Sequence, residues 1–140
     1  MAINFHPDPG TIVVCDFTGF VAPEMIKRRP AIVVSPRFRQ RDNLCSIVPL
    51  STSRPKSICA YHCQIDLDPV LPAPYDAARM WVKADMLNAV SFSRLSLPYV
   101  GKDEQGKRAY DVRHISDEDL EMVVKCLLNG LGLGRLTEYV

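Results

Sequence analysis

Short runs of β-branched and apolar residues, separated by loops and not by helices, make up most of the chain before residue 95. The runs that we interpret as strands cover residues 11–17, 30–35, 44–50, 61–67, 79–84 and 86–90. Parallel strands need a crossover of about a dozen residues or more, usually helical, and no helix is indicated between these runs. We therefore expect an antiparallel sheet that curls into a small barrel or sandwich.

Residues 116–131 are the one segment with the pattern of an amphipathic helix. Ser116 is a suitable N-cap, and the three acidic residues after it are favoured by the helix dipole. Gly130 or Gly132 is the expected stop. The apolar positions of one helix face are Leu120, Val123, Val124, Leu127, Leu128 and Leu131. The fold class predicted is mainly β (α+β), with this helix packed on the sheet.

The chain of 140 residues has the length of one domain, which we take as residues 1–140. Its core is expected over about residues 9–95, followed by a hairpin-like segment at 99–114. Apolar residues make up 47% and charged residues 24%, a globular balance. No run approaches a membrane span and the first residues lack a signal-peptide pattern, so we expect a cytoplasmic protein with reduced cysteines.

Charge is balanced overall, with 17 basic and 16 acidic residues, but it is not balanced locally. Between Glu24 and Lys56 there are eight basic residues and two acidic ones. One basic face suits a polyanionic ligand. The alternative is a solvated edge or loop whose charges oppose aggregation.

Three groups of polar residues lie at the ends of the expected strands. Glu24 and Arg29 precede the second strand, Ser51 and Thr52 follow the third, and Lys83 and Asp85 lie at the end of the fifth. Because consecutive antiparallel strands run in opposite directions, Arg29 and Ser51 are expected at the same edge of the sheet. A guanidinium, a hydroxyl and a carboxylate at one edge would form a phosphate site.

The segments that carry these residues resemble the PemK/MazF family of toxin endoribonucleases. The resemblance rests on three ordered stretches, GTIVVCDF (10–17), EMIKRRPAIVVSP (24–36) and VPLSTS (48–53), and spans about residues 9–95. It implies an SH3-like barrel with a C-terminal helix, usually a homodimer, that cleaves single-stranded RNA without a metal ion or cofactor. It also implies a protein partner, an antitoxin whose acidic segment occupies the RNA groove.

The resemblance places Glu24, Arg29, Ser51, Lys83 and Asp85 at site positions. Ser51 stands where the family usually has threonine, which keeps the hydroxyl. Lys83 stands where some members have arginine, which keeps the charge and loses the bidentate geometry. A proline-rich loop at 68–76 and the segment 99–114 are interpreted as additions to the family core.

RNA supplies its own nucleophile, the 2′-hydroxyl, so the protein must move protons and stabilise charge on phosphorus. Arg29 is expected to stabilise that charge while Ser51 donates a hydrogen bond to a phosphate oxygen. Glu24 or Asp85 is the expected base, and the sequence does not choose between them. Lys83 would contact a neighbouring phosphate or act as the acid.

Further basic and polar residues are expected to bind the RNA strand electrostatically. Phe38, between two arginines of the basic loop, would either stack on a base or anchor that loop in the core. The expected RNA-binding residues are Lys27, Arg28, Arg37, Arg39, Arg41, Thr52 and Arg54.

Two alternatives were weighed against this hypothesis. Cys59, His62 and Cys63 are close in sequence, but alternation along a strand would put both cysteines on one face and the histidine on the other, so we expect no metal site. The second alternative is a binding module on the same barrel without catalytic activity, either a nucleic-acid-binding regulator or a relative of toxins that target DNA gyrase.

Overall fold

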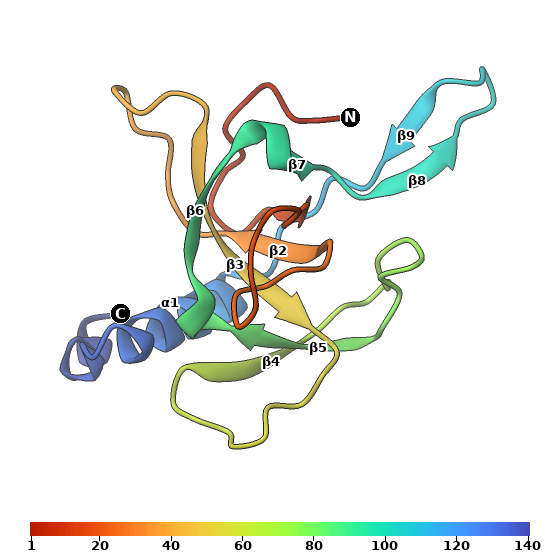
Figure 1. The fold of residues 1–140 in the computed structure, drawn as a ribbon. Helices are drawn as coiled ribbons and strands as arrows, with labels where there is room; N and C mark the ends of the chain where they lie inside the picture. The colour runs from red at the N-terminus through yellow and green to blue at the C-terminus, as the bar shows by residue number, and fades with distance from the viewer.

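The computed structural model describes residues 1–140, which form nine short strands, one α-helix and three short 3₁₀ helices (Figure 1). The strands are β1 (Ile12–Cys15), β2 (Arg29–Val33), β3 (Leu44–Ser51), β4 (His62–Asp66), β5 (Arg79–Lys83), β6 (Asn88–Ser91), β7 (Leu95–Ser96), β8 (Tyr99–Lys102) and β9 (Arg108–Tyr110). The helices are α1 (Asp117–Gly130), η1 (Ala84–Met86), η2 (Phe92–Arg94) and η3 (Gly134–Tyr139).

Seven of the strands form one antiparallel sheet, in the order β4-β5-β3-β2-β1-β7, with β6 also paired to β3. The predicted fold class is confirmed: a mostly β fold with one helix and a curled sheet, which stays open and does not close into a complete barrel. No helix in the structure has the length and apolar character needed to cross a membrane.

Strand β3 is the centre of this sheet, because it pairs with three other strands. One edge pairs with β2, and the other edge pairs first with β6 and then with β5. The change of partner falls between Ile47 and Leu50, next to Pro49, which has no N–H to donate to a neighbour. The curl of the sheet is therefore centred on the strand that ends at Ser51.

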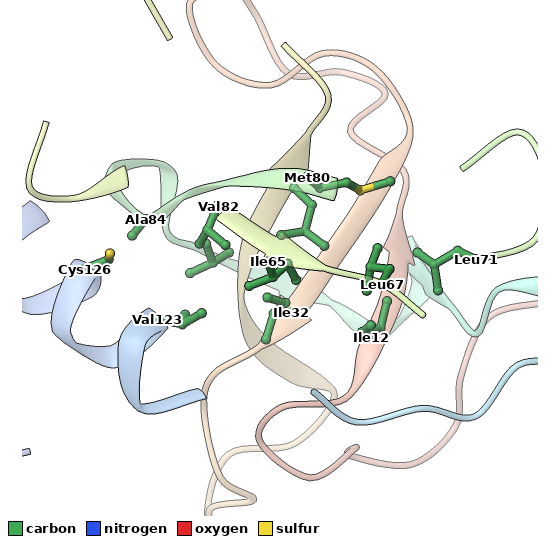
Figure 2. Close-up of a cluster of buried hydrophobic side chains, with 12 residues drawn as sticks. Ile12, Ile32, Ile65, Leu67, Leu71, Met80, Val82, Ala84, Val123 and Cys126 are labelled. Atoms are coloured by element: carbon green, nitrogen blue, oxygen red, sulfur yellow. The ribbon is translucent and has the colours of Figure 1, made fainter. Parts of the chain in front are cut away.

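Two hydrophobic clusters lie on the two faces of the central strands. Successive side chains of a strand point to opposite faces, so Ile12 and Ile32 belong to one cluster while Val13 and Ala31 belong to the other. Figure 2 shows the first cluster, in which Val123 of α1 packs towards the sheet. Burial on both faces explains why these strands are continuous apolar runs in the sequence.

Helix α1 begins and ends as the sequence predicts. The Ser116 hydroxyl accepts a hydrogen bond from the Asp119 amide at 3.1 Å. After Gly130, the amides of Gly132 and Leu133 donate to the carbonyls of Asn129 and Leu128, a Schellman motif that places Gly132 at a positive φ of 75°. Cap residues therefore set both ends of the helix.

The predicted hairpin is present as β8 and β9, a separate two-stranded ribbon that projects from the body of the molecule (Figure 1). Some boundaries differ from the prediction. The sixth strand begins only at Asn88, because η1 occupies residues 84–86. Strand β7 was not predicted, since two residues are too few to show a periodic pattern.

Candidate active site and nucleic-acid interface

The register of β2 and β3 brings Arg29 and Ser51 to the same edge of the sheet. Ala31 pairs with Pro49. Arg29 lies two residues before Ala31 and Ser51 lies two residues after Pro49, so in this antiparallel pair both lie towards the same end of the hairpin. Both line a pocket of about 220 Å³, which we call the basic pocket. Its polar lining consists of the cations Lys27, Arg28 and Arg29 and the hydroxyls Ser51, Thr52 and Ser53, together with Tyr75.

Arg29 carries a partly buried charge that nothing in the chain compensates. Its Nε is buried and has no hydrogen-bond partner, and its guanidinium forms no ion pair. Burial lowers the pKa of Arg29, because a low-dielectric environment disfavours the charged form. Arginine nevertheless stays protonated in proteins. The pocket therefore contains a partly desolvated cation with no partner in the chain, and such a charge suits an anion.

Ser51 is buried beside this cation, at the end of β3. Its Oγ accepts a hydrogen bond from the backbone amide of Ser53 at 3.1 Å. A hydroxyl oxygen that already accepts one bond still has its own proton to donate. Ser51 can therefore offer a hydrogen bond to an oxyanion in the pocket.

The loop between β4 and β5, which contains the proline-rich stretch, also lines the basic pocket. Pro74, Tyr75 and Ala77 line it, and burial raises the pKa of the Tyr75 phenol. Arg28, which also lines the pocket, forms an ion pair with Asp16 at 3.5 Å. Tyr75 and Asp16 were not identified from the sequence, because only the folding of distant segments places them here.

The two carboxylates predicted as the base do not line the basic pocket. Glu24 and Asp85 lie together at a second cavity of about 470 Å³, which we call the carboxylate pocket. The Glu24 Oε1 accepts a hydrogen bond from the Val21 amide at 3.1 Å, which stabilises the turn on which it lies. The expected group of arginine, hydroxyl and carboxylate is therefore divided between two pockets.

Lys83 and Asp85 lie next to His62, which was not predicted as a site residue. Lys83 pairs with His62 across β4 and β5. The His62 side chain is 7% exposed, and its Nε2 lies 3.9 Å from the Asp85 Oδ1. Its Nδ1 accepts a hydrogen bond from the Cys59 amide at 3.0 Å, which leaves the ring proton on Nε2, towards Asp85.

Cys59 and Cys63 do not lie on one strand, although the sequence predicted that they would. Strand β4 begins only at His62, so Cys59 precedes the strand and the expected alternation does not apply to it. All five cysteines are free thiols. No three His, Cys, Asp or Glu side chains are grouped in a way that could hold a metal ion.

The remaining basic residues lie away from the basic pocket. Arg37, Arg39 and Arg41 are on the loop that joins β2 to β3, at the opposite end of the hairpin from Ser51 (Figure 1). Arg41 donates to the Ser46 hydroxyl at 3.0 Å. Phe38 is exposed, so it does not anchor this loop in the core. Arg54 is exposed on the loop after β3 and does not line the pocket.

A protein-family model matches most of the chain, residues 8–130, and describes a PemK-like, MazF-like toxin of type II toxin-antitoxin systems. The chain belongs to this family. The matched range includes Arg29, Ser51 and all of α1, so it covers both the residues of the basic pocket named above and the helix packed against the sheet.

Individual relatives agree with the family. The uncharacterized protein YifN of Escherichia coli strain K12 is 32% identical, over 69% of this chain and 76% of its own length. The crystal structure of MazF (Form-I) from Deinococcus radiodurans has a TM-score of 0.57 at 26% identity, covering 91% of this chain and 98% of that one. The crystal structure of MazE-MazF (Form-II) from the same organism has a TM-score of 0.54 at 25% identity, covering 92% and 98%.

Proposed function

We propose that this toxin-family protein is an endoribonuclease that cleaves single-stranded RNA without a metal ion. The observation that carries the proposal is the uncompensated guanidinium of Arg29 beside the free hydroxyl proton of Ser51, in a pocket lined by two further cations. Such a pocket matches a phosphodiester, whose oxygens accept charge-assisted hydrogen bonds. Family membership supports the same activity.

In the proposed reaction the RNA 2′-oxygen attacks the adjacent phosphorus. A bond from the 2′-oxygen to phosphorus forms, the bond from phosphorus to the 5′-oxygen breaks, and a 2′,3′-cyclic phosphate remains. Arg29 stabilises the negative charge that develops on the phosphate, and Ser51 donates to one of its oxygens. Lys83 contacts a neighbouring phosphate or protonates the leaving 5′-oxygen.

The base that removes the 2′-proton is Glu24 or Asp85, as the sequence suggests. Asp16 forms an ion pair with Arg28, but hydrogen bonds from Thr18 lower the pKa of its carboxylate, which makes it a weak proton acceptor. Rates of RNA cleavage by Glu24→Gln and Asp85→Asn assign the role: the base is the residue whose neutral isostere abolishes cleavage across the pH range.

The family also indicates how the activity is controlled. We propose that the protein acts as a homodimer and that an antitoxin inserts an acidic segment into the basic pocket, where carboxylates replace the RNA phosphate. The Deinococcus MazE-MazF structure supports a protein partner of this kind. Sedimentation of the protein alone tests the dimer, and competition between an acidic peptide and RNA tests the inhibition.

The deciding experiment incubates the purified protein with a mixed-sequence RNA in EDTA. Wild type is expected to yield products that end in a 2′,3′-cyclic phosphate, and Arg29→Ala is expected to yield none while keeping its circular dichroism spectrum. Arg135→Ala, an exposed arginine on η3, is the matched control and should cleave as wild type does. Intact RNA with the wild-type protein would refute the proposal.

A second candidate is a nucleic-acid-binding module that does not cleave. One observation favours it: neither Glu24 nor Asp85 lines the pocket that contains Arg29 and Ser51. The same assay separates the candidates, because a binding module would shift the mobility of the RNA and leave it intact.

A further inference from the structure

A third cavity shares one wall with the basic pocket. It has a volume of about 210 Å³ and lies between the proline-rich loop and the segment that joins β7 to β8. Arg28, Pro74 and Tyr75 line both cavities. We call it the tyrosine pocket, because Tyr75 and Tyr99 both line it.

The two cavities differ in chemistry although they are almost equal in size. The basic pocket has three cations and three aliphatic hydroxyls, whereas the tyrosine pocket has one cation, one such hydroxyl, Ser96, and two aromatic rings. Apolar residues such as Val14 and Leu97 complete it, and no carboxylate lines it. The first cavity suits a phosphate, and the second suits a flat, apolar group with a polar edge.

We propose that the tyrosine pocket binds an unpaired nucleobase of the RNA strand whose phosphate occupies the basic pocket. The inference rests on the proposed function. Proteins read single-stranded RNA by stacking splayed bases on aromatic side chains and by hydrogen-bonding their edges. Tyr99 is 46% exposed and offers a ring for stacking, while the Ser96 hydroxyl and Arg28 provide polar contacts for a base edge.

The wall of the pocket is held in place before any ligand binds. Leu67 and Leu71 fix the proline-rich loop in the core. Arg113 donates to the carbonyls of Pro69 and Val70, and Asp111 pairs with Arg113 at 2.6 Å, with both side chains less than one-fifth exposed. A preorganised wall reduces the entropy lost on binding. The two segments that the sequence marked as additions therefore meet to build one pocket.

Equilibrium binding tests this inference directly. The probes are four pentanucleotides, each of one base, with 2′-O-methyl groups so that no 2′-hydroxyl can attack. Tyr99→Ala is expected to weaken binding of at least one of them by roughly tenfold, as expected for the loss of one base stack. Tyr99→Phe keeps the ring and should bind as wild type does. Tyr139→Ala, an exposed tyrosine on η3, is the matched control.

A second measurement avoids substitution altogether. A pentamer carrying 4-thiouridine, irradiated on the wild-type protein, should cross-link to the peptide that contains Tyr75 or Tyr99. Cross-links confined to other peptides, or unchanged binding of all four pentamers by Tyr99→Ala, would overturn the inference and leave this surface to a protein ligand. Neither binding nor cross-linking requires cleavage. Both measurements therefore test whether the tyrosine pocket binds a base even if the RNA in EDTA stays intact and the endoribonuclease proposal fails.

Discussion

Arg29 lines the basic pocket with a partly buried charge that has no partner in the chain. Its Nε is one of two buried side-chain polar atoms without a hydrogen-bond partner, the other being the Tyr110 hydroxyl. A desolvated charge with no partner destabilises a folded protein, and such groups are typical of sites that wait for a ligand. The pocket therefore retains a charge that a purely structural position would not favour.

Replacing this residue should separate stability from activity. Arg29→Met keeps the length of the side chain and removes the charge, so the midpoint of thermal unfolding is expected to rise by about 2–5 °C while RNA cleavage is lost. Thermal denaturation followed by circular dichroism, in the absence of RNA, measures the effect. A lower midpoint would mean that Arg29 stabilises the fold through contacts that outweigh its desolvation.

Asp16 should make the stability of the protein depend on pH. Thr18 donates from its amide and its hydroxyl to Asp16, and these bonds, together with nearby Arg28, lower the pKa of the carboxylate below its ordinary value of 3.8. The stabilisation is therefore complete above about pH 4 and is lost as the pH falls through the lower, folded-state pKa. Urea unfolding of wild type and Asp16→Asn should differ at pH 7 and converge in strong acid.

Several elements could be predicted from the sequence because local chemistry determines them. The helix has a serine cap, an acidic first turn and a glycine at its stop, and these features need no tertiary information. The buried strands are apolar on both faces and rich in β-branched residues. Strand β7 and η1 could not be predicted, since two or three residues carry no period and their structure depends on the neighbours they pair with.

The helix cap offers a test at this scale. Ser116→Ala removes the acceptor for the Asp119 amide and should lower the free energy of unfolding by about 1 kcal/mol. Ser116→Asp should retain most of the stability, because a carboxylate also accepts this bond and interacts favourably with the helix dipole. Urea denaturation of the three proteins measures both effects. An unchanged free energy of unfolding in Ser116→Ala would show that the cap bond contributes little.

At the scale of the whole molecule, the sequence predicted that Arg29 and Ser51 lie together, but it did not predict where the candidate carboxylates lie. Arg29 and Ser51 belong to one antiparallel hairpin, so chain direction alone places them at one edge. Glu24 and Asp85 lie on a turn and a 3₁₀ helix whose positions no strand register fixes, and they lie in a different pocket. The basic loop, which is expected from the sequence to bind the RNA strand, joins β2 to β3 and therefore lies at the far end of the same hairpin.

Because the basic loop and the basic pocket lie at opposite ends of the hairpin, the contribution of the loop to RNA affinity should depend on the length of the RNA. Strand β3 alone has eight residues and extends about 27 Å at roughly 3.4 Å per residue. Substituting Arg37, Arg39 and Arg41 together by alanine should leave the affinity for a trinucleotide unchanged. For a strand of about twenty nucleotides, the triple substitution should weaken binding. It should also reduce by about 2 the slope of the logarithm of the binding constant against the logarithm of the salt concentration.

Fluorescence titrations at several salt concentrations measure the affinity for RNA of both lengths. An unchanged affinity for the long strand would remove the basic loop from the RNA interface.

The proline-rich loop and the segment before β8 meet at the tyrosine pocket, and this position has a consequence for how ligand preference can vary among relatives. The stretches that surround Tyr75 and Tyr99 lie outside the hairpin that carries Arg29 and Ser51. Under the proposed function, insertions in these stretches would change which RNA base is bound and would leave Arg29 and Ser51 in place. Exchanging those two stretches between relatives should then transfer the base preference, while the proposed catalytic residues stay the same.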